Sequence, residues 1–282
     1  MPHPSKAYED RLRRVIDYIY DHADEDLSLD TLADVAAMSR FHWHRVFRAM
    51  TGETCAQAVR RVRLQRAGFL LARSDAPIAS IARACGLGGQ AAFSRAFAEA
   101  YGVPPARFRA EGQMRPMAFT PSQELTQMFD VTIETKPDMR MAAYAHKGDY
   151  TQIARAFEQF SAVASARGLW PQVEGMMGIY YDDPSTTPEA ELRSHAGALL
   201  APGAEVPEGL EEITIAGSRM ARLRLKGPYT GLPAAYNHLY GPWLQASGEE
   251  PSDAPSFELY INSPMDTAPD ELLTDIYMPL KS

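Results

Sequence analysis

Two segments in the first third of the chain each place an arginine opposite a row of apolar side chains. At about 100° per residue, residues 39–48 form a helix with one apolar and one polar side. The polar side of this first helix carries Phe41, His44, Arg45 and Arg48. In residues 89–97 the corresponding outer face carries Ala91, Ser94 and Arg95. Guanidinium groups and small residues on a rigid helix suit contact with base edges in the DNA major groove. The two faces therefore predict contacts with two successive grooves.

These side chains also have a simpler interpretation. An arginine on a helix is usually only solvated, which would leave Arg45 and Arg95 without a ligand. His44 could be an ordinary exposed histidine, and Phe41 could belong to the core. The DNA interpretation is favoured because Arg45 and Arg95 occupy equivalent positions in two similar helices.

The distribution of charge supports that interpretation. The whole chain has a net charge of −8, which by itself argues against a nucleic-acid partner. Residues 1–112, however, carry 16 Lys and Arg against 13 Asp and Glu, and residues 40–110 carry 12 against 3. The remaining 170 residues carry 12 against 23. Positive charge is concentrated where the two arginine helices lie, as phosphate contact requires.

Length and composition limit the other possibilities. A chain of 282 residues favours two domains, each large enough to bury a core. No apolar run approaches the ~20 residues needed to cross a bilayer, and the first residues lack the apolar core of a signal peptide. Cys55 and Cys85 have no nearby partner for a disulfide framework. The histidines are scattered, so we expect no metal and no other cofactor. We expect a cytoplasmic protein with no membrane partner.

The arginine helices must be positioned by other helices, which the apolar periodicity predicts. The expected helices are residues 8–20, residues 29–38, the first arginine helix between Ser39 and Gly52, residues 54–72, a short helix from Pro77, and the second arginine helix ending near Gly102. This order describes two helix-turn-helix units joined by a helix.

Several motifs in this region occur in one known family. They are Ser39-x-x-His42-x-x-Arg45-x-Phe47, Ile81-Ala82-x-x-x-Gly86, Phe93-Ser-Arg-x-Phe97 and the closing segment 102–109. With them, residues 27–109 resemble the double helix-turn-helix domain of AraC/XylS-type transcriptional regulators. The resemblance implies base-reading roles for Phe41, His44 and Arg45, and then for Gln90, Ala91, Ser94 and Arg95. Where that family often has glycine, this chain has Ala37, and we expect a slightly different turn there.

The second half of the chain contains an internal similarity at a shift of 79 residues. Residues 140–142 match residues 219–221, and residues 147–151 match residues 226–230. Each copy predicts a strand, a glycine turn, a helix and two more strands. We therefore expect an all-α double helix-turn-helix domain (1–112), a linker (113–128) and an α+β domain (129–282). The α+β domain would hold two β-α-β-β repeats, at about 129–200 and 209–282, around a pseudo-twofold axis. Helices would cover one sheet face, and the other would form a ligand groove.

The second half also resembles a known domain. The Lys-Gly-Asp/Pro-Tyr-Thr motif occurs in both copies, and residues 257–260 and 272–279 supply two further motifs. With these motifs, residues 129–282 resemble the GyrI-like effector-binding domain. The resemblance implies an amphipathic and often cationic ligand, held by a buried glutamate and aromatic rings. Glu258 is the residue that matches this glutamate.

The alternation of residues around Glu258 indicates which side chains accompany it. Phe257, Leu259 and Ile261 fall on one face of a strand, and Glu258 and Tyr260 fall on the other. If the apolar set packs on the helices, Glu258 and Tyr260 face the groove, together with Tyr180 of the first copy. An unpaired carboxylate among aromatic rings can bind a cation. The alternative is a solvated acid on an open sheet face.

Together these patterns predict a sequence-specific DNA-binding transcriptional regulator. Both arginine faces would project outward and read major-groove segments ~34 Å apart on double-stranded DNA. The second domain would bind a small effector, and RNA polymerase is a possible further partner. Two alternatives stay open for the second domain. It could hydrolyse reactive natural products, with Glu258 beside Tyr260 or Tyr229 as the base, or it could bind proteins without a ligand.

Overall fold

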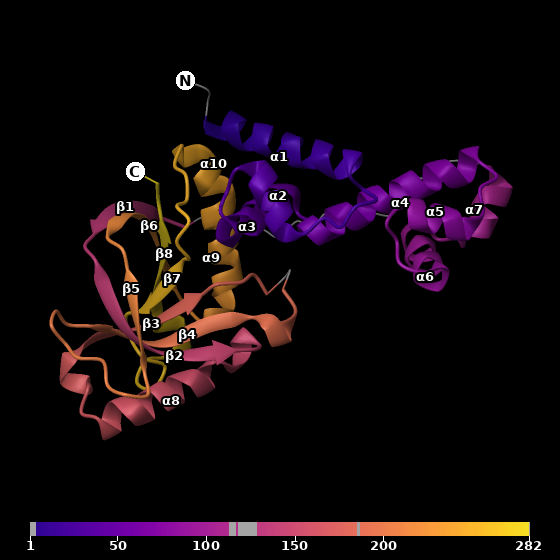
Figure 1. Cartoon of the computed structure of the whole chain (residues 1–282). Helices are drawn as coiled ribbons and strands as arrows, with labels where there is room; N and C mark the ends of the chain where they lie inside the picture. Colours follow the sequence, from indigo (N-terminus) through magenta and orange to yellow (C-terminus); the bar gives the residue numbers. More distant parts are fainter. Residues whose placement is uncertain (1–3, 113–116, 118–128, 185–186, 282) are drawn as a thin grey trace.

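A computed structural model describes residues 4–112, 117, 129–184 and 187–281 (Figure 1). The N-terminal part is helical, and a sheet with further helices follows it. The linker predicted for residues 113–128 lies, except for Met117, outside the described residues. The helices of the N-terminal part are α1 (Pro4–Asp21), α2 (Leu29–Ala36), α3 (Arg40–Thr51), α4 (Cys55–Arg73), α5 (Ile78–Ala84), α6 (Gln90–Tyr101) and α7 (Pro105–Glu111).

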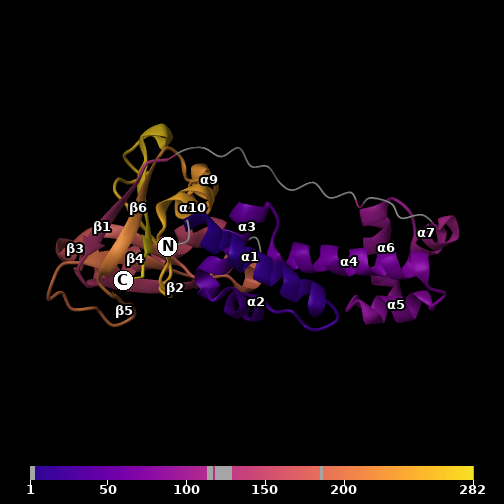
Figure 2. The ribbon, with the colours of Figure 1, turned by 90° about the horizontal axis from the view of Figure 1, so that it is seen from above.

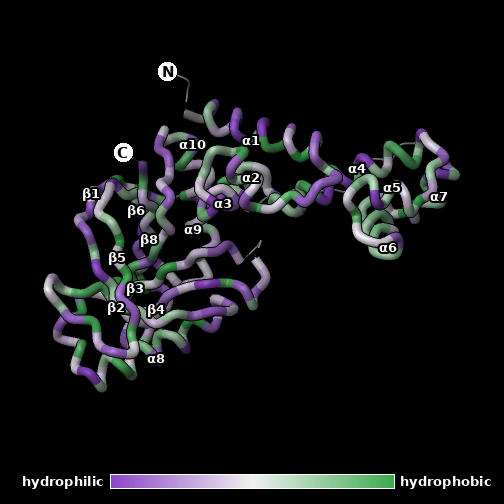
Figure 3. Tube along the Cα trace, viewed as in Figure 1, coloured by the Kyte–Doolittle hydropathy of each residue, from purple (hydrophilic) through white to green (hydrophobic). Residues whose placement is uncertain are grey.

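Helices α1 to α3 and the start of α4 form the first helix-turn-helix unit. The Ser28 and Ser39 hydroxyls accept hydrogen bonds from backbone N–H groups in the first turns of α2 and α3. Trp43 and Phe47 are fully buried in the core of this unit. Hydrophilic and hydrophobic residues alternate along α1, as its amphipathic pattern requires (Figure 3). The turn after α2 keeps a left-handed conformation at Ala37, with φ 53° and ψ 47°. An alanine in this left-handed conformation is strained, and a turn that differs from the glycine-containing one stays a prediction.

The second helix-turn-helix unit has a separate core. Phe93 and Phe97 of α6 pack with Phe108 of α7 and with Leu64 and Leu71 of α4. Helix α4 runs from one unit to the other, and α5, α6 and α7 lie at its far end, away from the sheet (Figure 2). The second unit is therefore held to the rest of the described structure mainly through α4.

The second half is one eight-stranded antiparallel sheet that curls. Its strand order is β1-β6-β8-β7-β3-β4-β2-β5. The bounds are β1 (Val131–Lys136), β2 (Met139–Lys147), β3 (Val173–Tyr180), β4 (Arg193–Leu200), β5 (Glu211–Ile215), β6 (Ser218–Lys226), β7 (Phe257–Tyr260) and β8 (Leu273–Pro279). The α+β class was predicted correctly, but β1 and β5 add a strand at the start of each half that the β-α-β-β pattern lacked.

Helices cover one face of this sheet. They are α8 (Ile153–Ala166), α9 (Leu232–His238), the π-helical segment Leu239–Trp243 and α10 (Leu244–Ser247). Ala142 and Ala198 pack against Phe160 of α8. The other face is buried by the curl of the sheet itself, where Met141, Met177 and other strand residues form a core that contains no helix residue. Both faces of the central strands are therefore covered.

The first helix-turn-helix unit docks on the sheet domain. Tyr8 of α1 and Val46 of α3 are buried in the same hydrophobic core as Leu239, Tyr240 and Ile276. The Tyr8 hydroxyl donates to the Glu249 carbonyl at 2.7 Å. Both views place α3 beside α9 (Figures 1 and 2). Because the two parts share an apolar core, their interface buries hydrophobic side chains and is not a purely polar contact. None of the helices in the described residues is long and apolar enough to cross a membrane.

Candidate functional site

Glu258 is a buried carboxylate at the centre of the sheet. It lies on β7 opposite Gly178 of β3, where the two halves of the domain meet, and is only 2% exposed. The Tyr236 hydroxyl donates to Oε1 at 3.0 Å, and the Tyr260 hydroxyl donates to Oε2 at 2.9 Å. Tyr180 in turn donates to the Tyr260 oxygen, with 2.8 Å between the two oxygens. The structure brings the predicted residues Glu258, Tyr260 and Tyr180 together.

Aromatic rings enclose this carboxylate. The Tyr260 ring makes edge contacts with Phe157 of α8 and with Tyr229, at centroid distances of 5.6 and 5.7 Å. The Tyr150 ring meets the Tyr180 ring at 5.0 Å. Gly178 provides the room, because a Cβ atom there would lie 3.0 Å from the Tyr260 hydroxyl. The result is a buried acid that accepts hydrogen bonds from two tyrosines and has further aromatic rings packed around those tyrosines.

Burial also changes the acidity of Glu258. Removal from water raises its pKa to about 7, although the hydroxyls of Tyr260 and Tyr236 and the charge of Arg45 favour the ionised form. The side chain can therefore exchange a proton near neutral pH. A bound cation would favour the carboxylate, and a neutral ligand would favour the acid.

The face of the sheet that carries Glu258 differs from the prediction. We expected Phe257 and Leu259 to pack on the helices and leave Glu258 facing an open groove. Instead Phe257 packs inside the curl of the sheet, and Glu258 points toward Tyr236 of α9. The apolar alternation could not distinguish the two faces because both are buried. The site therefore lies on the helix-covered face.

Arg45 of α3 reaches this site. Its guanidinium lies over the Tyr236 ring, with the central carbon 4.4 Å from the ring centroid, and 5.3 Å from the centroid of Tyr240. Tyr236 thus carries a cation on its ring and donates its hydroxyl to Glu258. Arg45 is partly buried here rather than on an open DNA-binding face, so the exposed placement predicted for it is wrong in this structure.

The neighbours of Arg45 on α3 are covered as well. His42 is fully buried; its Nδ1 lies 2.6 Å from the Tyr240 hydroxyl and its Nε2 lies 2.9 Å from the Ala254 carbonyl. His44 is 2% exposed and lies 3.3 Å from Asp183. Burial and the charge of Arg45 lower the pKa of His42 to about 3, which keeps the ring neutral. The expectation that His44 is exposed to DNA is therefore also wrong here, because the sheet domain packs over this face.

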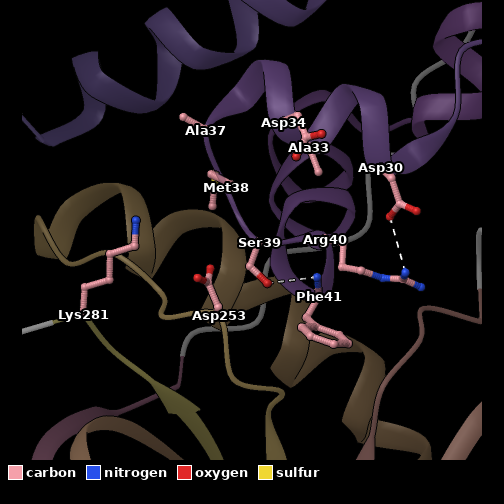
Figure 4. Close-up of a pocket in the computed structure, with 10 residues that line it drawn as sticks. All are labelled: Asp30, Ala33, Asp34, Ala37, Met38, Ser39, Arg40, Phe41, Asp253 and Lys281. Atoms are coloured by element: carbon pink, nitrogen blue, oxygen red, sulfur yellow. Dashed lines mark hydrogen bonds and ion pairs between the residues drawn. The ribbon is translucent and has the colours of Figure 1, made fainter.

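The remaining predicted residues of α3 lie at the edge of the contact. The Phe41 ring is half-buried, with its centroid 6.5 Å from that of Tyr181. It lines an open hollow of about 650 Å³ between α2, the start of α3 and the side chains of Asp253 and Lys281 (Figure 4). The lining of this hollow includes none of the described residues around Glu258. Arg48 is half-buried, one turn after His44.

The second arginine face is open. On α6, Gln90, Ala91 and Arg95 are exposed and Ser94 is half-buried, while Phe93 and Phe97 are buried on the opposite side. This is the arrangement predicted from the apolar periodicity. The two faces thus differ: α6 faces solvent and α3 faces the protein. Within the described residues, no group of three or more His, Cys, Asp or Glu side chains is placed to hold a metal ion.

Comparison with known proteins assigns each half of the chain to a domain family. Residues 32–111 match a helix-turn-helix domain family, and residues 129–281 match the family described as a GyrI-like small molecule binding domain. The probable transcription factor PqrA of Proteus vulgaris is 36% identical over 90 residues, which cover 32% of this chain and 74% of PqrA. The chain belongs to the AraC-type helix-turn-helix regulators with a GyrI-like domain.

Other relatives match over about a third of this chain. The HTH-type transcriptional regulator YbfP of Bacillus subtilis is 33% identical over 102 residues, which cover 36% of this chain and 35% of YbfP. The probable regulator LumQ of Photobacterium leiognathi matches over 41% of its own length. The chain thus spans well under half of these two regulators. Among solved structures, SAV2435 bound to tetraphenylphosphonium is 16% identical with a TM-score of 0.42, covering 54% of this chain and 94% of SAV2435.

Sequence reasoning missed several residues around Glu258. Phe157 and Tyr236 occupy matching positions in the 79-residue shift, and each now contacts the Glu258–Tyr260 pair. An aromatic residue retained at equivalent places in both halves was the available signal. Nothing in the sequence indicated that Arg45 would join this site.

Proposed function

We propose that this chain is an effector-responsive transcriptional regulator whose GyrI-like domain binds an organic cation. The observation that carries the proposal is the buried Glu258 carboxylate, held by two tyrosine hydroxyls within an aromatic enclosure. An isolated buried charge is costly, and a ligand of opposite charge removes that cost. The tyrosine rings add cation–π attraction, which strengthens when water is excluded.

The DNA-binding half of the proposal is supported by the helical domain. Helix α6 presents Arg95 and Gln90 on an exposed face, and α4 fixes its position relative to α3. Arginine contacts with guanine edges and phosphates are the usual source of affinity in such helices. Base-reading roles for Phe41, His44, Arg45 and the residues of α6 stay proposals, as does a contact with RNA polymerase.

Calorimetry with tetraphenylphosphonium tests the effector class, because this probe is bulky, aromatic and permanently charged. We expect binding to the full chain and a loss of at least tenfold in affinity in Glu258→Gln. Glu174→Gln is the matched control, since Glu174 is an exposed acid on the same sheet. Triphenylphosphine oxide, a neutral probe of similar shape, should bind far more weakly than the cation. Equal affinity of the wild type and Glu258→Gln for the cation would contradict the proposal.

The hydrolase alternative is favoured by the geometry of Glu258, a buried carboxyl that accepts from the Tyr260 hydroxyl at 2.9 Å, and burial raises its pKa to about 7. A carboxylate with such a pKa can act as a general base at neutral pH. Turnover of a strained electrophile, lost in Glu258→Gln and retained in Glu174→Gln, would support this activity. Cation binding without turnover would leave the regulator proposal as the better account.

A further inference from the structure

The chain itself supplies a cation beside the proposed effector site. Arg45 lies on the rings of Tyr236 and Tyr240, Tyr236 donates its hydroxyl to Glu258, and the positive charge of Arg45 favours the ionised form of Glu258. A guanidinium keeps its positive charge at any ordinary pH and stacks well on aromatic rings. Arg45 thus occupies one ring, Tyr236, that also belongs to the proposed effector site.

The same helix is fixed by contacts on both sides of Arg45. Ser256 can donate to Tyr240, Tyr240 to Nδ1 of His42, and Nε2 of His42 to the Ala254 carbonyl. This chain of hydrogen bonds fully satisfies a neutral histidine. His44 adds a contact with Asp183 at 3.3 Å. The face of α3 that carries His42, His44 and Arg45 is therefore held by specific polar and ring contacts, and is not only covered by neighbouring atoms.

The helix backbones also approach closely. A Cβ atom placed on Gly241 of the π-helical segment would lie 3.0 Å from the Cβ of Ala49. Val46 is buried in the shared core one turn before Ala49. Helix α3 cannot present this face to a DNA groove while it remains in this position, because the groove must accept the whole helix.

We propose that α3 is a tethered competitor of the effector: Arg45 occupies the ring of Tyr236 beside Glu258 while the sheet domain covers the outer face of α3, and a cation bound beside Glu258 displaces the helix and frees it for DNA. This inference rests on the proposed function, since it requires that the site binds a cation. Helix α6 stays exposed throughout, so the docked form keeps one reading helix and the released form has two. The effector would thus control specific binding more than weak contact with phosphates.

Competition of this kind makes the measured affinity depend on docking. The apparent dissociation constant equals the intrinsic constant divided by the fraction of chains in the released form. Any change that weakens docking should therefore tighten cation binding, even when it removes no group of the cation site. Arg45→Ala removes the tethered cation and should lower the apparent dissociation constant of tetraphenylphosphonium at least threefold. Arg107→Ala, which removes an exposed arginine of α7, should leave it unchanged.

A reversible cross-link tests the displacement of the helix directly. The contact of Ala49 with Gly241 is close enough for a disulfide after a small adjustment, since paired Cβ atoms usually lie ~3.5–4.5 Å apart. In the full-length Ala49→Cys/Gly241→Cys variant, oxidation should weaken tetraphenylphosphonium binding at least tenfold, and reduction should restore it. Both native cysteines, Cys55 and Cys85, are buried, and the oxidised wild type is the control.

The outcomes separate the two proposals. Equal cation affinity of the oxidised and reduced double variant would overturn the competition and leave the effector site intact. Cation binding by none of the forms, Arg45→Ala included, would overturn the proposed effector class and the competition with it. If the double variant fails to fold, Arg45→Ala decides: unchanged or weaker binding of the cation relative to wild type refutes the tethered competitor.

Discussion

Replacing Glu258 by glutamine should stabilise the protein, and more so in alkaline than in acidic solution. Burial raises the pKa of this carboxyl from 4.5 to about 7 in the folded chain. An acid whose folded pKa is raised loses stability as the pH rises from the unfolded pKa through the folded one. The cost is absent below pH ~4.5 and complete above pH ~7. Glutamine keeps the shape and cannot ionise; its amide oxygen accepts from one of the two tyrosine hydroxyls, and its NH2 group donates to the hydroxyl oxygen of the other.

The size of the expected stabilisation follows from the shift in the pKa of Glu258. At 1.36 kcal/mol per pKa unit, the raised pKa of Glu258 lowers the free energy of unfolding by about 3 kcal/mol at pH 8 and about 1 kcal/mol at pH 5.5. The stabilisation in Glu258→Gln should therefore grow by about 2 kcal/mol between these pH values. For a domain of this size, 1 kcal/mol corresponds to roughly 2–4 °C in Tm.

Thermal unfolding of wild type and Glu258→Gln at both pH values measures this difference. Other titrating groups are common to the two proteins, so their contributions cancel when Tm values are subtracted at each pH. Glu174→Gln, at an exposed position on the sheet, should show no such trend. A Glu258→Gln shift in Tm that is equal at pH 5.5 and pH 8 would refute the reasoning, because it would mean that the carboxyl does not titrate abnormally.

Three further predictions concern the helical domain. Arg95→Ala should weaken binding to selected operator DNA and reduce the salt slope by about one, measured by fluorescence anisotropy at several salt concentrations; an unchanged slope would exclude a phosphate contact. Ala37→Gly should raise the free energy of unfolding by about 1 kcal/mol in denaturant titrations, because glycine accepts the left-handed turn without strain, and no gain would show that the strain is relieved elsewhere. Acid should release α3, since His42 has a pKa of about 3 when docked and ~6.5 when exposed. The protection of α3 amides against hydrogen exchange, corrected for the slower intrinsic exchange in acid, should fall from pH 7 to pH 5.5, and an identical fall in His42→Asn would contradict this role.

Much of the helical domain could be predicted from the sequence. Apolar periodicity and the caps at Ser28 and Ser39 located the helices, and Trp43 and Phe93 were correctly assigned to the core. These features depend on contacts within a few turns of chain, which short patterns encode. The same is true of the Glu258 strand, where alternation identified which side chains share a face.

The docking of α3 could not be predicted in the same way. Helical periodicity separates the two sides of a helix but does not identify what covers each side. Helix α3 carries bulky side chains on both sides, with Trp43 on one and Phe41 on the other, and such a helix is often buried on both. The bulky residues on both sides of α3 therefore indicated a second contact. They could not identify the partner surface, because Tyr236 and Tyr240 lie almost 200 residues away along the chain.

The docked helix also sets the energetic requirement for a switch. Converting a population from 99% docked to 99% released requires a total preference of about 5.5 kcal/mol for the released form. In the proposed switch, a cation that displaces Arg45 from Tyr236 gains only the difference between its own contacts and those of the guanidinium. DNA would contribute the remainder if it binds the face that docking covers. Linkage then requires that DNA tightens cation binding by the same factor that the cation tightens DNA binding. In this proposal the position of Arg45 on Tyr236 couples the two ligands, since a side chain expected to contact DNA is held at the effector site and can occupy only one of the two surfaces at a time.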